Sequence, residues 1–116
     1  MAELREEFRQ NYVRMLQAVL KCGKPLAVCT VYDPRFPEPV AQRLTTTALN
    51  IFNDCILREA ITLGLPVLDL RLVCSAAEDY ANEIEPGIPG GKKIAAGILE
   101  LFTVHDFSGN RTVVYK

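Results

Sequence analysis

Residues 26–32 read LAVCTVY, a continuous run of apolar and β-branched side chains. A run without polar alternation is typical of a strand that is covered on both faces, as strands in parallel sheets are. Residues 67–72 read VLDLRL and predict a second strand of the same kind. Because long stretches with helical periodicity surround these two runs, the order of the elements predicts an α/β fold with a parallel sheet and right-handed crossovers.

Three amphipathic stretches predict the helices that cover this sheet, since their apolar residues recur three or four positions apart. They lie at about 2–22, at about 42–63, and in a third segment that opens with Gly90 and Gly91. Residues 75–89 are polar and predict a long loop with one helical turn near 76–80. Residues 105–116 form a tail with a candidate short strand at 112–115. We therefore expect a single domain over residues 1–116.

The composition excludes several classes of protein. The 116 residues carry 13 Lys and Arg against 14 Asp and Glu, so no basic surface is available to neutralise nucleic-acid phosphates. No run of about 18 apolar residues is present that could span a membrane. The charged stretch after Met1 does not resemble a secretory signal. These features predict a soluble, cytoplasmic protein without nucleic-acid or membrane partners.

The cysteines and the lone histidine argue against a cofactor. Cys22, Cys29, Cys55 and Cys74 show no Cys-x-x-Cys spacing, and His105 is the one histidine in the sequence. With one histidine, a zinc site would need an unusual set of ligands. We therefore predict reduced, mostly buried thiols, with neither a metal nor another cofactor.

Two strands are too few for a stable doubly wound sheet. Such a narrow sheet would leave its edges open and the covering helices only partly packed. The chain is therefore expected to be part of a larger doubly wound sheet that is completed by oligomerisation. Two copies would pair along the edge of strand 26–32, or would exchange the tail strand 112–115.

Four segments, taken in order, resemble the C-terminal half of SGNH (GDSL-type) hydrolases. These segments are PLAVCTVYDP (25–34), ALNIFND (48–54), GLPVLDLR (64–71) and IEPGIPGGKKIA (84–95). The resemblance implies hydrolysis of ester-like bonds in a three-layer, flavodoxin-like and SGNH-like parallel sheet whose N-terminal strands are absent here. The Asp-x-x-His-Pro motif of that family falls on the loop, with Asn82 at the Asp position and Glu85 at the His position. The family's Gly-Asp-Ser nucleophile block has no counterpart here, so the resemblance implies a rebuilt site.

Charged groups follow both predicted strands, and ligands of open parallel sheets bind beyond the carboxyl ends of the strands. The candidate catalytic residues are Glu85 or Asp33 as general base, and Cys74 as the thiol nearest this crevice. The candidate substrate-binding residues are Tyr32, Arg35, Arg71, Asp79 and Asn82, with the arginines suited to grip a carbonyl or anionic group. The alternative is a solvated rim whose charges pair with one another.

Three functional hypotheses remain open from the sequence. The first is an SGNH-like hydrolase that acts on a small-molecule ester at a rebuilt site. The second is a non-catalytic remnant of the fold that serves as an interaction module. The third is a carboxylate-dependent hydrolase in which two of five acidic residues act as acid and base. Those residues are Asp33, Asp69, Asp79, Glu83 and Glu85.

Overall fold

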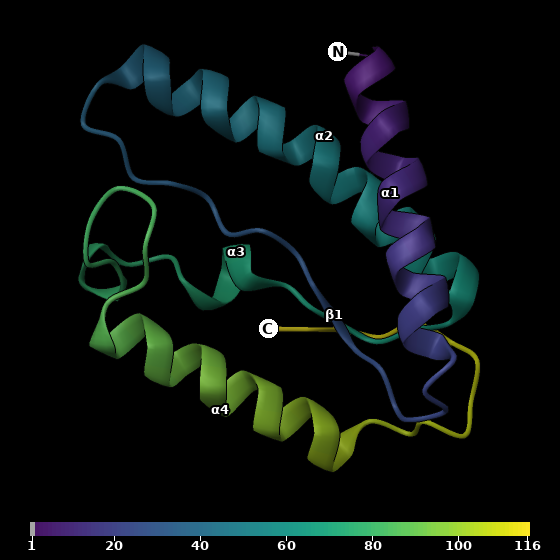
Figure 1. Cartoon of the computed structure of the whole chain (residues 1–116). Coiled ribbons are helices and arrows are strands. Elements are labelled where there is room, and N and C mark those ends of the chain that lie inside the picture. Colours follow the sequence, from purple (N-terminus) through teal and green to yellow (C-terminus); the bar gives the residue numbers. More distant parts are fainter. Residues whose placement is uncertain (1) are drawn as a thin grey trace.

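The computed structural model describes residues 2–116 and shows a mixed α/β fold that is mostly helical (Figure 1). The elements are α1 (Ala2–Leu20), β1 (Val28–Cys29), α2 (Pro39–Leu63), β2 (Val67–Leu68), α3 (Leu70–Val73), the 3₁₀ turn η1 (Ala77–Asp79), α4 (Ile88–Val104) and β3 (Val114–Tyr115). None of the helices within residues 2–116 combines the length and the apolar character that crossing a membrane requires. The predicted α/β class is confirmed.

The sheet has three parallel strands in the order β1-β2-β3. Val67 of β2 lies between Val28 of β1 and Val114 of β3. The tail therefore supplies a third strand, so the expectation of a two-stranded sheet is wrong. In this chain β3 pairs with β2 of the same molecule, and an exchange of residues 112–115 between copies is not needed to form it.

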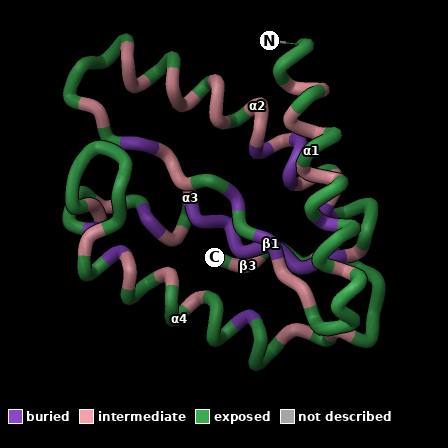
Figure 2. The backbone as a smooth tube through the Cα atoms, in the orientation of Figure 1, coloured by how far each residue is buried: buried purple, intermediate pink, exposed green. Residues whose placement is uncertain are grey.

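Helices cover both faces of this sheet, with α1 and α2 on one side and α4 on the other (Figure 1). Val28 and Val67 pack with Leu16 of α1 on the first face. Leu68, the neighbour of Val67, points to the opposite face and packs with Leu101 of α4. Figure 2 shows the buried residues concentrated along the strands between the helical layers. The period of two along each strand divides the core into these two clusters.

The two crossovers do not share one hand. Both connections step in the same direction across the sheet, yet α2 and α4 lie on opposite faces. One of the two crossovers must therefore be left-handed, which contradicts the expectation that both are right-handed. Strands of two residues have little twist with which to impose the usual hand.

The helix ends follow local capping signals. α2 begins at Pro39 because the side chain of Glu38 accepts a hydrogen bond from the Ala41 N–H at 2.6 Å. It ends at Gly64, whose φ of 68° suits the left-handed C-cap conformation. An added Cβ at Gly64 would lie 2.3 Å from the carbonyl oxygen of Asn110, so the chain leading to β3 also requires glycine there.

The predicted strand 67–72 is wrong beyond Leu68. Asp69 accepts a hydrogen bond from the Arg71 N–H and acts as the N-cap of α3. The chain therefore leaves the sheet directly after Leu68 instead of continuing as a strand. The strand predicted at 26–32 is likewise shorter, with Val28 and Cys29 as its paired residues.

Asn53 of α2 replaces a strand partner at the end of β1. The side chain is fully buried; its Oδ1 accepts from the Val31 N–H at 2.8 Å, and its Nδ2 donates to the Val31 carbonyl oxygen at 2.9 Å. The N–H groups of Val28 and Thr30 donate to Pro66 and Leu68, so those of the alternate residues, including Val31, point away from β2. Asn53 thus satisfies the outward backbone of Val31 and fixes α2 to the sheet.

We predict that Asn53→Ala lowers the free energy of unfolding by about 2–4 kcal/mol, because it removes two hydrogen bonds and leaves the backbone N–H and C=O of Val31 without their partner. The measurement is equilibrium unfolding in urea. Asn50→Ala, an exposed position on the same helix, is the matched control and should change stability by less than about 0.5 kcal/mol. Equal stability of the two variants would contradict the assigned role of Asn53.

Candidate functional site

The loop between α3 and α4 folds back over the carboxyl ends of β1 and β2. The Tyr80 hydroxyl lies 2.5 Å from the carbonyl oxygen of Asp33 and 3.1 Å from that of Cys74. The Tyr32 hydroxyl donates to the Ile84 carbonyl oxygen at 2.7 Å. These contacts bring the segment after β1 against the loop, so the predicted crevice residues do gather at one end of the sheet.

Asp79 anchors this loop from within. The residue is fully buried, and its Oδ2 accepts hydrogen bonds from the N–H groups of Ser75 at 3.2 Å and Ala76 at 3.0 Å. Lys93 Nζ lies 2.8 Å from Oδ1. The hydrogen bond from Lys93, followed by that from Ala76, lowers the pKa of Asp79. The predicted role of Asp79 in substrate binding is therefore not supported, because the fold itself uses this carboxylate.

The close contact between the loop and α4 requires glycine at position 90. An added Cβ there would lie 2.1 Å from the carbonyl oxygen of Asp79. No side chain fits at that distance, so the first turn of α4 can meet the anchored loop only through Gly90. Gly91 has open space beside it, and therefore no comparable packing requirement.

Asp69 and Arg71 form a second ion pair, in which each charged group already has a partner within the fold. Arg71 Nε donates to Oδ1 of Asp69 at 2.9 Å and Nη2 donates to Oδ2 at 2.8 Å. The Thr30 hydroxyl also donates to Oδ1, at 2.8 Å. The hydrogen bond from Arg71, with a smaller contribution from Thr30, lowers the pKa of Asp69 against the opposing effect of burial. Because this bidentate pair engages its guanidinium, Arg71 is not supported as a substrate-binding residue.

Cys74 lacks the environment of a nucleophile. Its exposure is 2%, and its Sγ lies 4.0 Å from the Gly90 carbonyl oxygen. Burial, followed by the negative charge of Asp79, raises the pKa of the thiol. A raised pKa disfavours the reactive thiolate. The proposed catalytic role of Cys74 is therefore not supported.

The remaining cysteines and His105 do not form a reactive pair with Cys74. All four cysteines are free thiols, as expected, but Cys22 and Cys29 are exposed, whereas Cys55 and Cys74 are buried. His105 Nδ1 lies 2.8 Å from the Tyr115 hydroxyl. His105 follows α4, at the end opposite to the loop, so it cannot activate Cys74.

Asn82 and Glu85 form the exposed turn of the loop. Asn82 Oδ1 accepts hydrogen bonds from the N–H groups of Ile84 and Glu85, both at 2.9 Å. Asn82 therefore shapes the turn through the backbone and does not hold the Glu85 carboxylate. Glu85 is exposed, and its negative charge, after burial and the charge of Cys74, helps to raise the pKa of Tyr32. The neighbouring Ile84 accepts a hydrogen bond from the Tyr32 hydroxyl, so the turn that carries Glu85 lies against the end of β1.

Asp33 and Arg35 complete this surface. Oδ1 of Asp33 is buried and has no hydrogen-bond partner among residues 2–116. The Asp33 charge contributes to the raised pKa of Arg71, after the larger effects of Asp69. Arg35 Nη1 donates to the Ser75 carbonyl oxygen at 3.3 Å, and its guanidinium lies 5.8 Å from the centre of the Tyr80 ring. Asp33 therefore retains an acceptor that the fold does not use.

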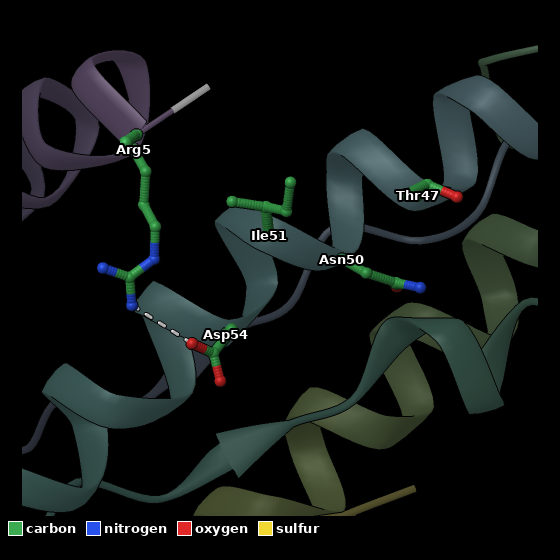
Figure 3. A pocket seen from close by; sticks show the side chains of 6 residues that line it. Arg5, Thr47, Asn50, Ile51 and Asp54 are labelled. Carbon is green, nitrogen blue, oxygen red and sulfur yellow. Dashed lines mark hydrogen bonds and ion pairs between the residues drawn. The ribbon is translucent and has the colours of Figure 1, made fainter.

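A groove between α1 and α2 is the main alternative site (Figure 3). Its volume is about 450 Å³, and it is lined by Ala2, Arg5, Thr47, Asn50, Ile51 and Asp54. Its charged groups are already paired, with Arg5 Nη2 3.2 Å from Asp54 Oδ2. Asp54 is also bound by Arg58 at 2.8 Å. The groove offers no free acid–base pair, so the residues at the strand ends are the better candidates.

The chain matches no protein-family model, and neither curated proteins nor solved structures provide a significant match. Within residues 2–116, no three His, Cys, Asp or Glu side chains gather closely enough to hold a metal ion. The geometry at the strand ends is therefore the main evidence on function.

Sequence reasoning missed two residues that organise this site. Tyr80 joins the segment after β1 to the loop, and Lys93 pairs with the buried Asp79. An aromatic residue inside an otherwise polar loop was the available signal for Tyr80. Lys93 carried no such signal, since its partner lies on another element.

We predict that Asp69→Asn lowers the free energy of unfolding at pH 7 by about 1–3 kcal/mol, because it weakens the bonds to Arg71 and Thr30. The folded-state pKa of Asp69 lies below the unfolded value of about 3.9, so its stabilisation is present above that pH and is lost as the pH falls through the folded value. Stability should therefore change less between pH 5 and pH 3 in the variant than in the wild type.

Urea unfolding at a series of pH values checks this prediction. Glu78→Gln, an exposed carboxylate on η1, is the control and should retain the acid dependence of the wild type. The same pH dependence in Asp69→Asn as in the wild type would show that Asp69 is not the linked group.

Proposed function

We propose that this chain carries the acid–base half of an SGNH-like site that hydrolyses ester-like bonds. The observation that supports the proposal best is the position of Glu85. It is an exposed carboxylate on a turn shaped by Asn82, beyond the ends of two parallel strands and directly ahead of α4. This arrangement agrees with the sequence resemblance, in which Glu85 stands at the position of the family's histidine.

In the proposed reaction, water is the nucleophile. The ionised Glu85 carboxylate accepts a proton as the water oxygen bonds to the ester carbonyl carbon. The carbon–oxygen bond to the leaving group then breaks, and that oxygen takes the proton back from Glu85, so the products are an acid and an alcohol. Arg35, at the same end of the sheet, would donate to the developing oxyanion.

We predict that purified protein hydrolyses p-nitrophenyl butyrate and that Glu85→Gln lowers kcat/KM by about 100-fold or more, because the amide cannot accept the proton. Release of p-nitrophenol gives the rate. Glu83→Gln, an exposed carboxylate two residues earlier, is the matched control and should retain activity.

Hydrolysis by the wild type at the rate of buffer alone, or full activity in Glu85→Gln, would refute this assignment. Asp33→Asn tests the version of the proposal with two carboxylates, which the unpartnered Oδ1 of Asp33 favours. A comparable loss in that variant would make Asp33 the second acid–base group.

We further propose that two copies pair along the outer edge of β1. By the alternation of the strand, the backbone N–H and C=O of Cys29 point away from β2, while Asn53 already occupies those of Val31. In a symmetric antiparallel contact centred on Cys29, the backbone N–H and C=O of this residue would form hydrogen bonds with those of the other copy. The contact would also widen the sheet toward a flavodoxin-like form.

We predict that mild oxidation links the two copies through Cys29. Hydrogen-bonded antiparallel partners have Cα atoms about 5.5 Å apart, and disulfides span Cα separations of about 4.4–6.8 Å. Non-reducing electrophoresis should show a dimer that Cys29→Ser abolishes. Cys22→Ser removes the other exposed thiol and should leave the dimer intact.

Sedimentation of the reduced protein measures the association without the disulfide. A monomer at all accessible concentrations would contradict the edge pairing, as would a dimer linked only through Cys22.

A further inference from the structure

An apolar hollow lies beside the proposed acid–base residue. Its volume is about 300 Å³, and it is lined by Val31, Tyr32, Pro34, Thr45, Leu49 and Ile84. The residues come from three parts of the chain: the end of β1, one side of α2 and the exposed turn of the loop. Glu85 follows Ile84 directly, so the turn that carries the proposed general base also forms one wall of the hollow.

Hydrogen bonds fix three of the walls of this hollow. Asn53 holds both backbone groups of Val31, at 2.8 and 2.9 Å. Gln42 Nε2 donates to the Pro34 carbonyl oxygen at 2.7 Å. The Tyr32 hydroxyl donates to the carbonyl oxygen of Ile84 at 2.7 Å. The hollow is therefore formed before any ligand arrives, as binding sites for small molecules usually are.

The lining selects for hydrocarbon. Thr45 contributes one hydroxyl, and the hydroxyl of Tyr32 is already bonded to the loop, so the remaining surface is apolar. We infer that this hollow binds the acyl chain of the ester, so that the substrate class is neutral esters of short, unbranched fatty acids. This inference rests on the proposed hydrolase function, since it takes Glu85 as the group at the reacting bond.

The negative charge of Glu85 on the adjoining turn fits a neutral substrate. An ester carries no charge and can approach Glu85, whereas the carboxylate product is repelled by it. The same repulsion would help the product to leave. A neutral, non-hydrolysable probe is therefore suitable for measuring binding, and hexanamide combines a carbonyl group with an unbranched chain.

The catalytic test uses Leu49→Phe, which fills the hollow from α2. Its kcat/KM for p-nitrophenyl hexanoate, relative to that for p-nitrophenyl acetate, should fall by about ten-fold, since loss of room for a few methylene groups has an effect of this size. Leu44→Phe is the matched control, because Leu44 lies on the same helix, is 68% exposed and does not line the hollow. It should keep the preference of the wild type.

The binding test needs no variant and no turnover. Hexanamide added to the ¹⁵N-labelled wild-type protein should shift the amide resonances of Val31, Thr45, Leu49 and Ile84. Absence of these shifts, together with an unchanged chain-length preference in Leu49→Phe, would overturn the inference even if hydrolysis depends on Glu85. Shifts at these residues without any hydrolysis would support the hollow as a binding site and refute the hydrolase proposal alone.

Discussion

The buried carboxylate of Asp69 is the point at which the three strands are joined. Its side chain accepts from the Thr30 hydroxyl after β1 and from Arg71 in α3, while its own N–H donates to the Tyr115 carbonyl oxygen of β3. The Thr30 hydroxyl also accepts from the Leu70 N–H at 2.9 Å. Strands of two residues have few ladder hydrogen bonds, so these contacts hold the sheet ends together and turn the chain out of β2.

The charged groups at this end of the sheet consequently divide into two sets. Asp69 with Arg71 and Asp79 with Lys93 are buried or half-buried pairs that hold the loop and the first turn of α4 in place. Asp33 and Glu85 have no such partners in residues 2–116. The first set fixes the shape of this end of the sheet, and the second contains carboxylates that the fold does not pair. The residues that hold the loop in place are thus different from the residues with unpaired carboxylates, although both sets lie at the same end of the sheet.

Prediction from sequence succeeded where the signals were local. The apolar periodicity located α1 and α2, and Gly64 marked the helix end correctly. The prediction from sequence failed at residues 69–72. The stretch VLDLRL has the pattern of one strand, but Asp69 starts a helical turn. The alternation of apolar residues cannot reveal that choice, because the contact with Thr30 joins positions 39 residues apart. The same limit applied to Tyr80 and Lys93, whose partners lie on other elements.

The sequence by itself determined the α/β class, the positions of the long helices and the set of polar residues beyond the strands. Those properties follow from periodicity and capping, which act within a few residues along the chain. Only the tertiary structure decided that residues 114–115 join the sheet, that Cys74 is buried and that Asp79 is bound by Lys93. These outcomes depend on which distant groups meet, because burial and pairing set the cost of each charge and the reactivity of each thiol.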